Sequence, residues 1–351
     1  MSSLSINQQT VPFSRPPSPG RQRKLGWVGL GNMGYLMARN LAKGKRDGPP
    51  LLVWNRTPSK SEELQKELGT LVRIANDLTD LVEQCDIIFT SLNEDSVVKS
   101  VYEQFAETLK SKPASHLKIF VETSTIFPSL AIQLDSLITT LPHCHLVTSP
   151  VFGPPATADK AQLVIIMSGD YRAKKEVAHL LVPSVGRKVL DLGGNIIKAP
   201  TFKLIGNSMI LGTIEVLAEG FTFADKSGID PSNVLTFVQE MLPAPNMVNY
   251  ANRMAHDNFD GTTGFSIDGG IKDASHIRHL STKNDVPLPA IDVAYQHLLT
   301  ARALHRSAQQ AGTTNLDVLD WSGMVAGARV AAGLDAFDST KHKYPVQEAN
   351  D

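Results

Sequence analysis

The chain has 351 residues, of which 42% are hydrophobic and 20% are charged. This composition is typical of a soluble globular protein with room for two domains, and it excludes a disordered, collagenous or coiled-coil chain. Lys plus Arg is 34 and Asp plus Glu is 35, so the formal net charge of -1 indicates neither a nucleic-acid partner nor a membrane surface. No apolar run approaches the length of a membrane span. Small molecules are therefore the expected ligands.

The N-terminal residues and the cysteines indicate the cellular compartment of the protein. Residues 1–20 are rich in Ser, Gln and Pro without apolar periodicity, which predicts a disordered tail. No acidic residue precedes Asp47, as in mitochondrial transit peptides, but the Pro cluster opposes the amphipathic helix that such peptides need. Cys85 and Cys144 form no Cys-x-x-Cys pair and are too few for a disulfide framework, which fits a reducing compartment. We expect a cytoplasmic protein, with mitochondrial import as the alternative.

Residues 21–199 alternate short apolar runs with helical patterns. This alternation predicts a mainly parallel sheet with helices on its faces. Asp77 is a predicted helix N-cap, and Gly44 and Gly69 are predicted helix stops. The predicted strands cover 25–30, 51–54, 71–74, 87–90, 119–122, 145–149 and 163–167, and a further βα-like stretch covers 171–198.

Beyond Pro200 the strand signals end and helical periodicity continues. This predicts an all-helical domain over 200–335, followed by a flexible tail over 336–351. Glycine and proline interrupt the pattern at 228–231, 243–245, 257–264 and 286–289. The segment 201–226 is apolar on most faces, which predicts a helix buried between layers or domains.

A glycine-rich run follows the first predicted strand and opens the first helix. It reads Gly29-Leu30-Gly31-Asn32-Met33-Gly34. Glycines at this spacing allow a tight turn, the close approach of a pyrophosphate to the backbone, and close packing of helix on strand. The N–H groups at the helix start then hold the anion. The sequence therefore predicts a dinucleotide site formed by these six residues, rather than a glycine-rich turn without a ligand.

The end of the second predicted strand indicates which dinucleotide binds. Asn55, Arg56 and Thr57 stand where an NAD enzyme carries a carboxylate for the ribose 2′-hydroxyl. An arginine there can pair with a 2′-phosphate, while Asn55, Thr57 and Lys60 can add hydrogen bonds. We predict NADP(H) in preference to NAD(H). The alternative is that Arg56 is an ordinary solvated surface residue.

Six segments together resemble the β-hydroxyacid dehydrogenases, a family that includes 3-hydroxyisobutyrate dehydrogenase and the glyoxylate/succinic semialdehyde reductases. The likeness runs from about Lys24 to about Ala332. It implies an α/β N-terminal Rossmann domain with a doubly wound, mainly parallel sheet, followed by an all-α domain of the 6-phosphogluconate dehydrogenase-like type. It also implies a homodimer or homotetramer. The segments are Gly29–Gly34, Thr90–Asn93, Glu122–Thr125, Ser149–Gly153, Phe202–Asn207 and Ile271–Asp273.

The resemblance implies that Lys203 is the general acid that protonates the substrate carbonyl during hydride transfer, and the general base in the reverse direction. Independently, an ammonium within an apolar helix is costly to bury unless it faces a polar cleft, although Lys203 could instead reach solvent from the helix start. Asn207 lies one turn away and would orient the substrate, its alternative role being helix packing. The resemblance implies that a second cation, Lys272, lies near Lys203 and lowers its pKa. We also place Lys272 among the predicted cofactor-binding residues.

The other ligand contacts also follow from family position. Ser124 and the backbone around Phe152 and Gly153 would bind the substrate, whereas Ser91, Leu92 and Thr125 would border the nicotinamide ribose. A helix N-cap is the alternative role for Ser124 and Thr125.

The substrate loop departs from the family pattern, which usually reads Pro-Val-Ser-Gly-Gly. Here Phe152 replaces a hydroxyl with an apolar ring, Pro154 removes a backbone N–H, and Ala161 stands where another glycine is usual. The retained Lys203 and Asn207 predict interconversion of a hydroxyacid and a carbonyl compound. The altered loop favours a larger or less polar carbonyl substrate. We have no interpretation for Asn93, which stands where proline is frequent.

Three alternatives to this function remain. Imine reductases and reductive aminases share the fold and strand ends like Asn55-Arg56-Thr57, and some relatives bind the cofactor without turnover, but Lys203 opposes both. Sugar-acid decarboxylation as in 6-phosphogluconate dehydrogenase is disfavoured because the longer helical domain is missing.

His276 and His279 lie three apart on a predicted helix without a third ligand at matching spacing, so no metal site is predicted.

Overall fold

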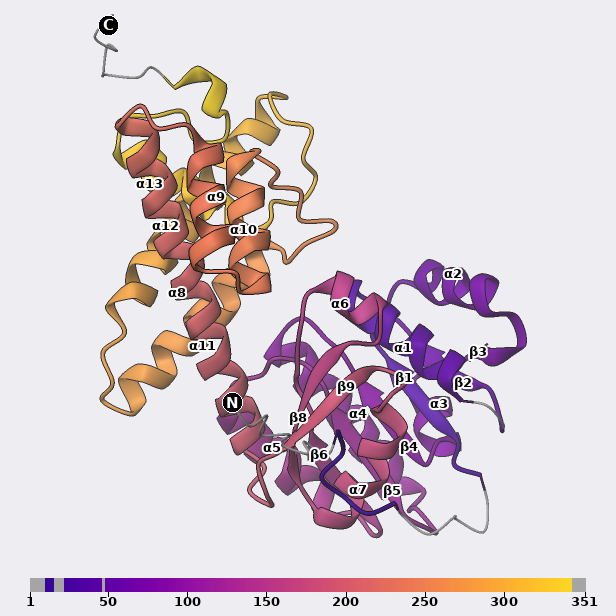
Figure 1. Ribbon diagram of the computed structural model, residues 1–351. Helices are drawn as coiled ribbons and strands as arrows, with labels where there is room; N and C mark the ends of the chain where they lie inside the picture. The colour runs from indigo at the N-terminus through magenta and orange to yellow at the C-terminus, as the bar shows by residue number, and fades with distance from the viewer. Residues whose placement is uncertain (1–9, 16–21, 46–47, 343–351) are drawn as a thin grey trace, which may run out of the picture. The chain divides into compact units, whose positions relative to one another are not determined.

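The computed structural model describes residues 10–15, 22–45 and 48–342 (Figure 1). The chain divides into two compact units, Met1–Lys203 and Leu204–Asp351. The boundary lies within helix α8 (Lys198–Lys226), slightly beyond the border predicted between residues 199 and 200.

The first unit is built on one nine-stranded sheet, ordered β3-β2-β1-β4-β5-β6-β8-β7, with β9 also paired to β8. Strands β1 to β6 pair in parallel, and β8 pairs antiparallel with β6 and β7. Strand order reverses between β1 and β4, the place where open α/β sheets bind ligands. The predicted doubly wound sheet is confirmed. The strands are β1 (Leu25–Val28), β2 (Leu51–Trp54), β3 (Val72–Ile74), β4 (Ile87–Thr90), β5 (Lys118–Glu122), β6 (Cys144–Thr148), β7 (Val151–Phe152), β8 (Leu163–Gly169) and β9 (Gly186–Asp191).

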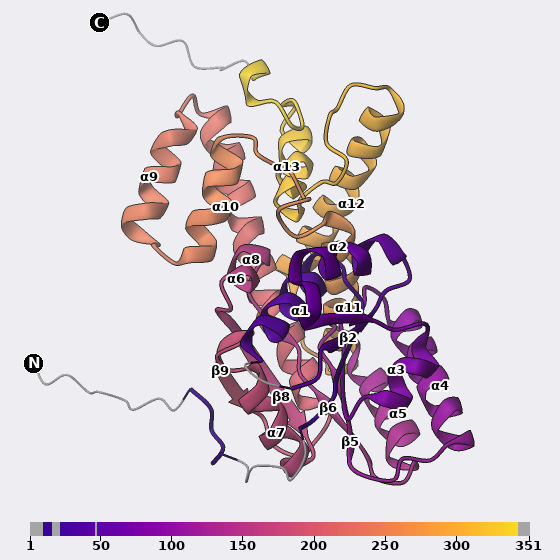
Figure 2. The same cartoon turned by 90° about the vertical axis from the view of Figure 1, so that its right-hand side faces the viewer.

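Helices cover both faces of this sheet, and Figure 2 shows α3, α4 and α5 along one of them. Asp77 caps α3 by accepting the Asp80 N–H at 2.7 Å, α1 ends at Gly44, and Gly69 closes α2 at φ +57°, all as predicted. One core contains the stacked rings of Trp27 and Phe89, whose centroids are 5.3 Å apart. The helices are α1 (Asn32–Gly44), α2 (Pro58–Leu68), α3 (Leu78–Gln84), α4 (Asp95–Ser111), α5 (Pro128–Thr139), α6 (Pro155–Asp159) and α7 (Tyr171–Leu181).

Residues 10–15 depart from the disordered tail predicted over 1–20. The carbonyl of Thr10 accepts the N–H of Val189 at 2.9 Å, which joins this segment to β9. Phe13 is buried and packs edge-on against Tyr171. His179 Nε2 also lies 3.1 Å from the Phe13 carbonyl oxygen. Long-range contacts thus hold a segment whose composition alone predicts disorder. Residues 1–9 and 16–20 of the predicted tail lie outside the described residues.

The second unit is helical, as predicted, and its helices are separated at the four predicted breaks. Residues 336–342 differ from the flexible tail predicted over 336–351. His342 is buried, with Nδ1 3.1 Å from a carboxylate oxygen of Asp225. Residues 343–351 lie outside the described part. The helices are α8, α9 (Pro231–Met241), α10 (Pro245–Ala255), α11 (Ile267–Lys283), α12 (Pro289–Gln310) and α13 (Val325–Ala331).

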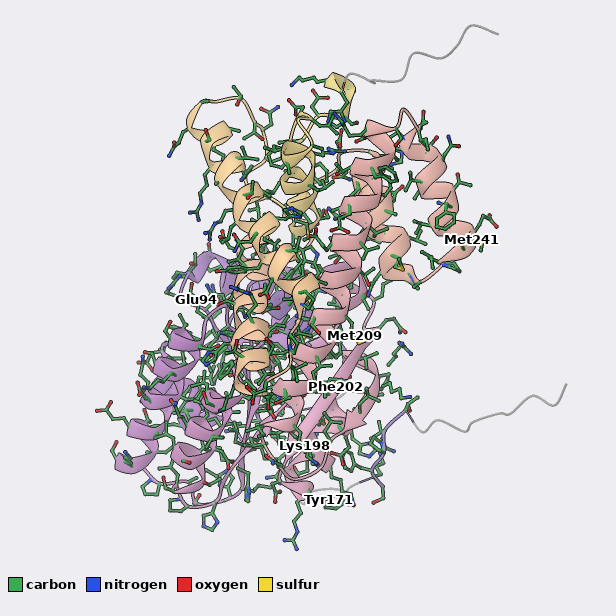
Figure 3. All side chains as sticks on the ribbon, turned by 90° about the vertical axis from the view of Figure 1, so that its left-hand side faces the viewer. Glu94, Tyr171, Lys198, Phe202, Met209 and Met241 are labelled. Carbon is green, nitrogen blue, oxygen red and sulfur yellow. The ribbon has the colours of Figure 1, made fainter. Side chains whose placement is uncertain are left out.

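Helix α8 is only half buried, which corrects the predicted burial of segment 201–226. Leu211, Ile214 and other apolar side chains on one face lie in the core, whereas Met209, Val216 and Phe223 on another face are 70%, 60% and 76% exposed. Met209 is labelled on α8 in Figure 3. Among the described helices, α8 alone has the length and hydropathy that would permit a membrane span, but its buried face is that of a core helix.

Both cysteines lie in the first unit, buried and unbridged. Burial raises the pKa of Cys85 to about 12 and that of Cys144 to about 11. The two thiols are therefore protonated at neutral pH.

Candidate functional site

The glycine loop has the shape that a pyrophosphate requires. Gly29 has φ +94°, and a Cβ there would lie 2.2 Å from the Ser91 carbonyl oxygen. A Cβ on Gly34 would lie 2.2 Å from the Gly29 carbonyl oxygen, so this glycine packs helix α1 onto the loop. A Cβ on Gly31 would meet nothing within 4 Å. The loop is thus tightly packed at its two outer glycines and open at the middle one, where α1 begins.

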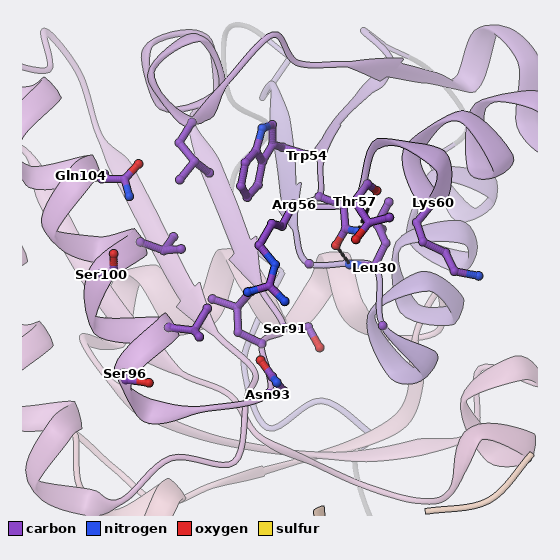
Figure 4. Close-up of a pocket in the computed structure, with 17 residues that line it drawn as sticks. Leu30, Trp54, Arg56, Thr57, Lys60, Ser91, Asn93, Ser96, Ser100 and Gln104 are labelled. Atoms are coloured by element: carbon purple, nitrogen blue, oxygen red, sulfur yellow. Dashed lines mark hydrogen bonds between the residues drawn. The ribbon is translucent and has the colours of Figure 1, made fainter. Parts of the chain in front are cut away.

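A cavity of about 820 Å³ opens beside this loop (Figure 4). The ends of β1, β2 and β4 form one side, and helix α4 forms the other. The guanidinium of Arg56 extends into the space between them. Among the lining residues only Arg56 and Lys60 are charged, and both are cationic. The lining residues are Gly29, Leu30, Gly31, Trp54, Asn55, Arg56, Thr57, Lys60, Leu78, Ser91, Leu92, Asn93, Ser96, Val97, Ser100, Val101 and Gln104.

Helix α4 supplies polar groups that sequence reasoning missed. Ser96, Ser100 and Gln104 are four residues apart and line the same cavity. That spacing places them on one helix face, and a polar face on this helix could have been predicted from it. Recognising it required knowing that α4 faces the glycine loop.

Asn55 connects the glycine loop to the end of β2. Its Oδ1 accepts the Leu30 N–H at 2.9 Å, and its Nδ2 donates to the Thr57 carbonyl at 3.0 Å. The side chain thus uses both of its polar ends to hold the loop, and the second N–H of its amide stays a predicted donor to a 2′-phosphate. Arg56 and Thr57 are exposed at the cavity.

Ser124 joins the ends of two neighbouring strands. Its Oγ accepts the Leu92 N–H at 2.7 Å, while its own N–H donates to Glu122 Oε1 at 2.7 Å. Thr90 Oγ1 donates to the other carboxylate oxygen, also at 2.7 Å. Ser124 therefore fixes the loop that contains Ser91 and Leu92, and it is itself buried. Thr125, the next residue, is half-buried and is absent from the residues that line the cavity.

Glu122 is fully buried beneath this edge, and sequence reasoning gave it no role. Burial raises its pKa to about 7, although hydrogen bonds from Ser124 and Thr90 oppose the increase. In the unfolded chain the pKa is about 4.3. Between these values the folded state holds a proton that the unfolded state has lost, so stability decreases as the pH rises from about 4 to about 7.

We expect Glu122→Gln to remove this pH dependence, because an amide has no charge to bury. In wild type, ionisation of Glu122 should make the free energy of unfolding lower at pH 8 than at pH 5 by roughly 3 kcal/mol. Urea unfolding at both pH values measures the difference, with Glu107→Gln, an exposed site, as the control. Equal pH dependence in wild type and Glu122→Gln would contradict this assignment.

Lys203 lies against the aromatic ring of Phe152. Its Nζ is 4.4 Å from the ring centroid, within cation–π range. Phe152 in turn makes an edge-on contact with Phe202, with the centroids 6.1 Å apart. Gly153 follows with φ +136°, and a Cβ there would lie 2.7 Å from a Leu163 methyl. The structure thus brings together Lys203 and the loop residues Phe152 and Gly153, all in the first unit.

Asn207 and Lys272 meet at Asp273 in the second unit. Asn207 Nδ2 donates to one carboxylate oxygen at 2.7 Å, and Lys272 Nζ is 3.2 Å from the other. Asn207 and Asp273 are both buried. Asp273 therefore fixes the orientation of two side chains that sequence reasoning selected, although it was itself given no role. Within the residues that the structure describes, including His276 and His279, no group of three His, Cys, Asp or Glu side chains is arranged to bind a metal.

Comparisons with known proteins agree with this geometry. Residues 24–193 match the NAD binding domain of 6-phosphogluconate dehydrogenase, and residues 198–317 match the NAD-binding domain of NADP-dependent 3-hydroxyisobutyrate dehydrogenase. The NADH-dependent oxidoreductase ucdB of Aspergillus ustus is 31% identical over 269 residues, which are 76% of this chain and 88% of that protein. The chain belongs to the β-hydroxyacid dehydrogenase family. It is an NAD(P)-dependent oxidoreductase, which confirms the family and fold predicted from the six segments.

Two further relatives of this β-hydroxyacid dehydrogenase family member extend the comparison. Glyoxylate/succinic semialdehyde reductase 1 of Arabidopsis thaliana is 26% identical over 80% of this chain and 93% of that protein. The structure of Mycobacterium tuberculosis 3-hydroxyisobutyrate dehydrogenase with L-serine superposes with a TM-score of 0.68 at 20% identity, covering 88% of this chain and 100% of that one. The structural likeness shows that this family member has the same fold.

Proposed function

We propose that the protein is an NADPH-dependent carbonyl reductase in which Lys203 is the general acid. The observation that carries the choice of NADPH is the charge of the cavity beside the glycine loop, whereas the role of Lys203 rests on the family membership of the chain. That cavity is lined by Arg56 and Lys60 and by no carboxylate. A 2′-phosphate would be attracted there, whereas the ribose 2′-hydroxyl of NADH would find no acidic acceptor. Lys60 is also paired with Glu63 at 3.1 Å, so Arg56 is the principal candidate.

The chain's own residues would divide the reaction between them. The open position at Gly31 and the start of α1 would bind the pyrophosphate. NADPH, when bound, supplies the hydride. Lys203 would donate a proton to the carbonyl oxygen as negative charge develops there, and it would accept that proton in the oxidative direction. Asn207, oriented by Asp273, would hold the substrate, and Ser124 would act by fixing Ser91 and Leu92 at the cofactor.

Alternatives remain for both the cofactor and the reaction. The Aspergillus ustus relative is described as NADH-dependent, which favours NADH as the alternative cofactor. Imine reduction and cofactor binding without turnover remain alternatives to carbonyl reduction, and the retained Lys203 opposes both.

A spectrophotometric assay would test the proposed function. Oxidation of NADPH and of NADH is followed with succinic semialdehyde, glyoxylate and larger apolar aldehydes and ketones, each with and without an amine. We expect turnover without amine and a preference for NADPH. Turnover that requires an amine would instead indicate an imine reductase, and tight NADPH binding without turnover would indicate a binding module.

We further propose that the protein assembles as a homodimer or homotetramer. The exposed apolar residues Met209, Val216 and Phe223 follow one another at intervals of seven along α8, and they form a face suited to packing against a second helix. Light scattering of the purified protein should give the mass of two or four chains. A monomer mass at micromolar concentration would contradict this proposal.

A further inference from the structure

The loop after β7 is poor in the hydrogen-bond donors that a carboxylate needs. Pro154 and Pro155 have no N–H, and the N–H groups of Thr157 and Ala158 both donate to the Pro154 carbonyl, at 2.9 and 3.1 Å. Phe152 contributes no hydroxyl. A carboxylate placed at this loop could accept only from the Gly153 and Ala156 N–H groups and the Thr157 hydroxyl, fewer donors than the same loop would offer without its two prolines.

The same loop places an aromatic surface beside the proposed proton donor. The Phe152 ring is 4.4 Å from Lys203 Nζ and is half-buried, and the Phe202 ring contacts it edge-on. A substrate whose carbonyl oxygen reaches Lys203 would therefore bring its remaining atoms close to the Phe152 ring, with the Phe202 ring behind it in the same cluster. Aromatic and apolar groups gain from such contacts through burial and ring packing.

We infer that Phe152 determines specificity, and that the substrate has an aromatic or bulky apolar group in place of the carboxylate of a hydroxyacid. This inference rests on the proposed function, because it takes Lys203 as the group that binds the carbonyl. It assigns to Phe152 two contacts, one with the Lys203 ammonium and one with the apolar group of the substrate.

Two aldehydes that share a three-carbon aldehyde chain make a matched test. Succinic semialdehyde ends in a carboxylate and 3-phenylpropanal ends in a phenyl group. Wild type should reduce 3-phenylpropanal with the higher kcat/KM, by about 10-fold or more. Phe152→Ser, which restores a hydroxyl, should shift the ratio of the two kcat/KM values toward succinic semialdehyde by about 10-fold or more.

Phe152→Leu is the matched control, since it keeps the loop apolar but removes the ring. It should still prefer 3-phenylpropanal, with a smaller ratio than wild type, and its NADPH dissociation constant should match that of wild type. A wild-type preference for succinic semialdehyde, or an active Phe152→Ser enzyme with an unchanged ratio, would overturn the inference while the proposed function stands. Failure of wild type to reduce any carbonyl compound would overturn both.

Discussion

Replacing Lys203 with alanine should lower kcat for carbonyl reduction by roughly 100- to 10,000-fold, the usual contribution of a positioned general acid. Without the ammonium, the oxygen of the developing alkoxide would have to take its proton from water. The NADPH dissociation constant should change by only a few-fold, because Lys203 packs on Phe152 and is not among the residues that line the cofactor cavity. Steady-state rates and fluorescence titration of NADPH measure the two effects separately.

Lys198 provides the control for this experiment. It begins the same helix, lies in the same unit and is exposed (Figure 3). Lys198→Ala should retain the wild-type kcat, so a loss confined to Lys203→Ala would reflect chemistry rather than the loss of a positive charge on α8. Retention of full activity by Lys203→Ala would refute its role as the general acid.

Replacing Arg56 should weaken NADPH binding much more than NADH binding. Loss of a charge-assisted contact to a 2′-phosphate corresponds to about 1–3 kcal/mol, or roughly 5- to 150-fold in dissociation constant. Arg56→Ala should show this loss for NADPH and a much smaller change for NADH. Arg56→Asp should go further, because its carboxylate would repel the phosphate and could accept a hydrogen bond from the ribose 2′-hydroxyl of NADH.

Fluorescence titration of both cofactors against wild type, Arg56→Ala and Arg56→Asp makes this comparison. Lys60→Ala is the matched control, since Lys60 lines the same cavity but is paired with Glu63, and its effect on NADPH should be smaller. If Arg56→Ala changed the NADPH and NADH constants equally, Arg56 would not contact the 2′-phosphate.

The parts of the fold that could be predicted are those with a local signal. Strands β2 and β4 have the bounds predicted for them, Asp77 caps a helix as its side chain predicts, and Gly69 ends one as its free backbone predicts. Strand β7 has only two residues, too few to show alternation, and its existence depends on pairing with β8. The order of residues 10–15 likewise depends on long-range contacts of Thr10 and Phe13, which composition does not encode.

In the candidate site, too, features with a local sequence pattern could be predicted and features that depend on distant contacts could not. The glycine loop and Arg56 have a spacing that indicates their chemistry, and the structure places both at one cavity. Asp273 and Glu122 act through partners distant in sequence, Asn207 and Thr90, so no local pattern marks them. The contact of Lys203 with Phe152 is of the same kind, although Phe152 stood out because it departs from the family's substrate loop.

The buried, protonated state of both cysteines has a practical consequence. Cys85 and Cys144 are each at most 5% exposed, so alkylating reagents and mild oxidants should react with neither while the chain is folded. The protein can therefore be purified and assayed without a reducing agent. Among the described methionines, Met209 and Met241 are the most exposed, at 70% and 64%, so oxidative damage by peroxide during storage should begin as methionine sulfoxide on the helical unit.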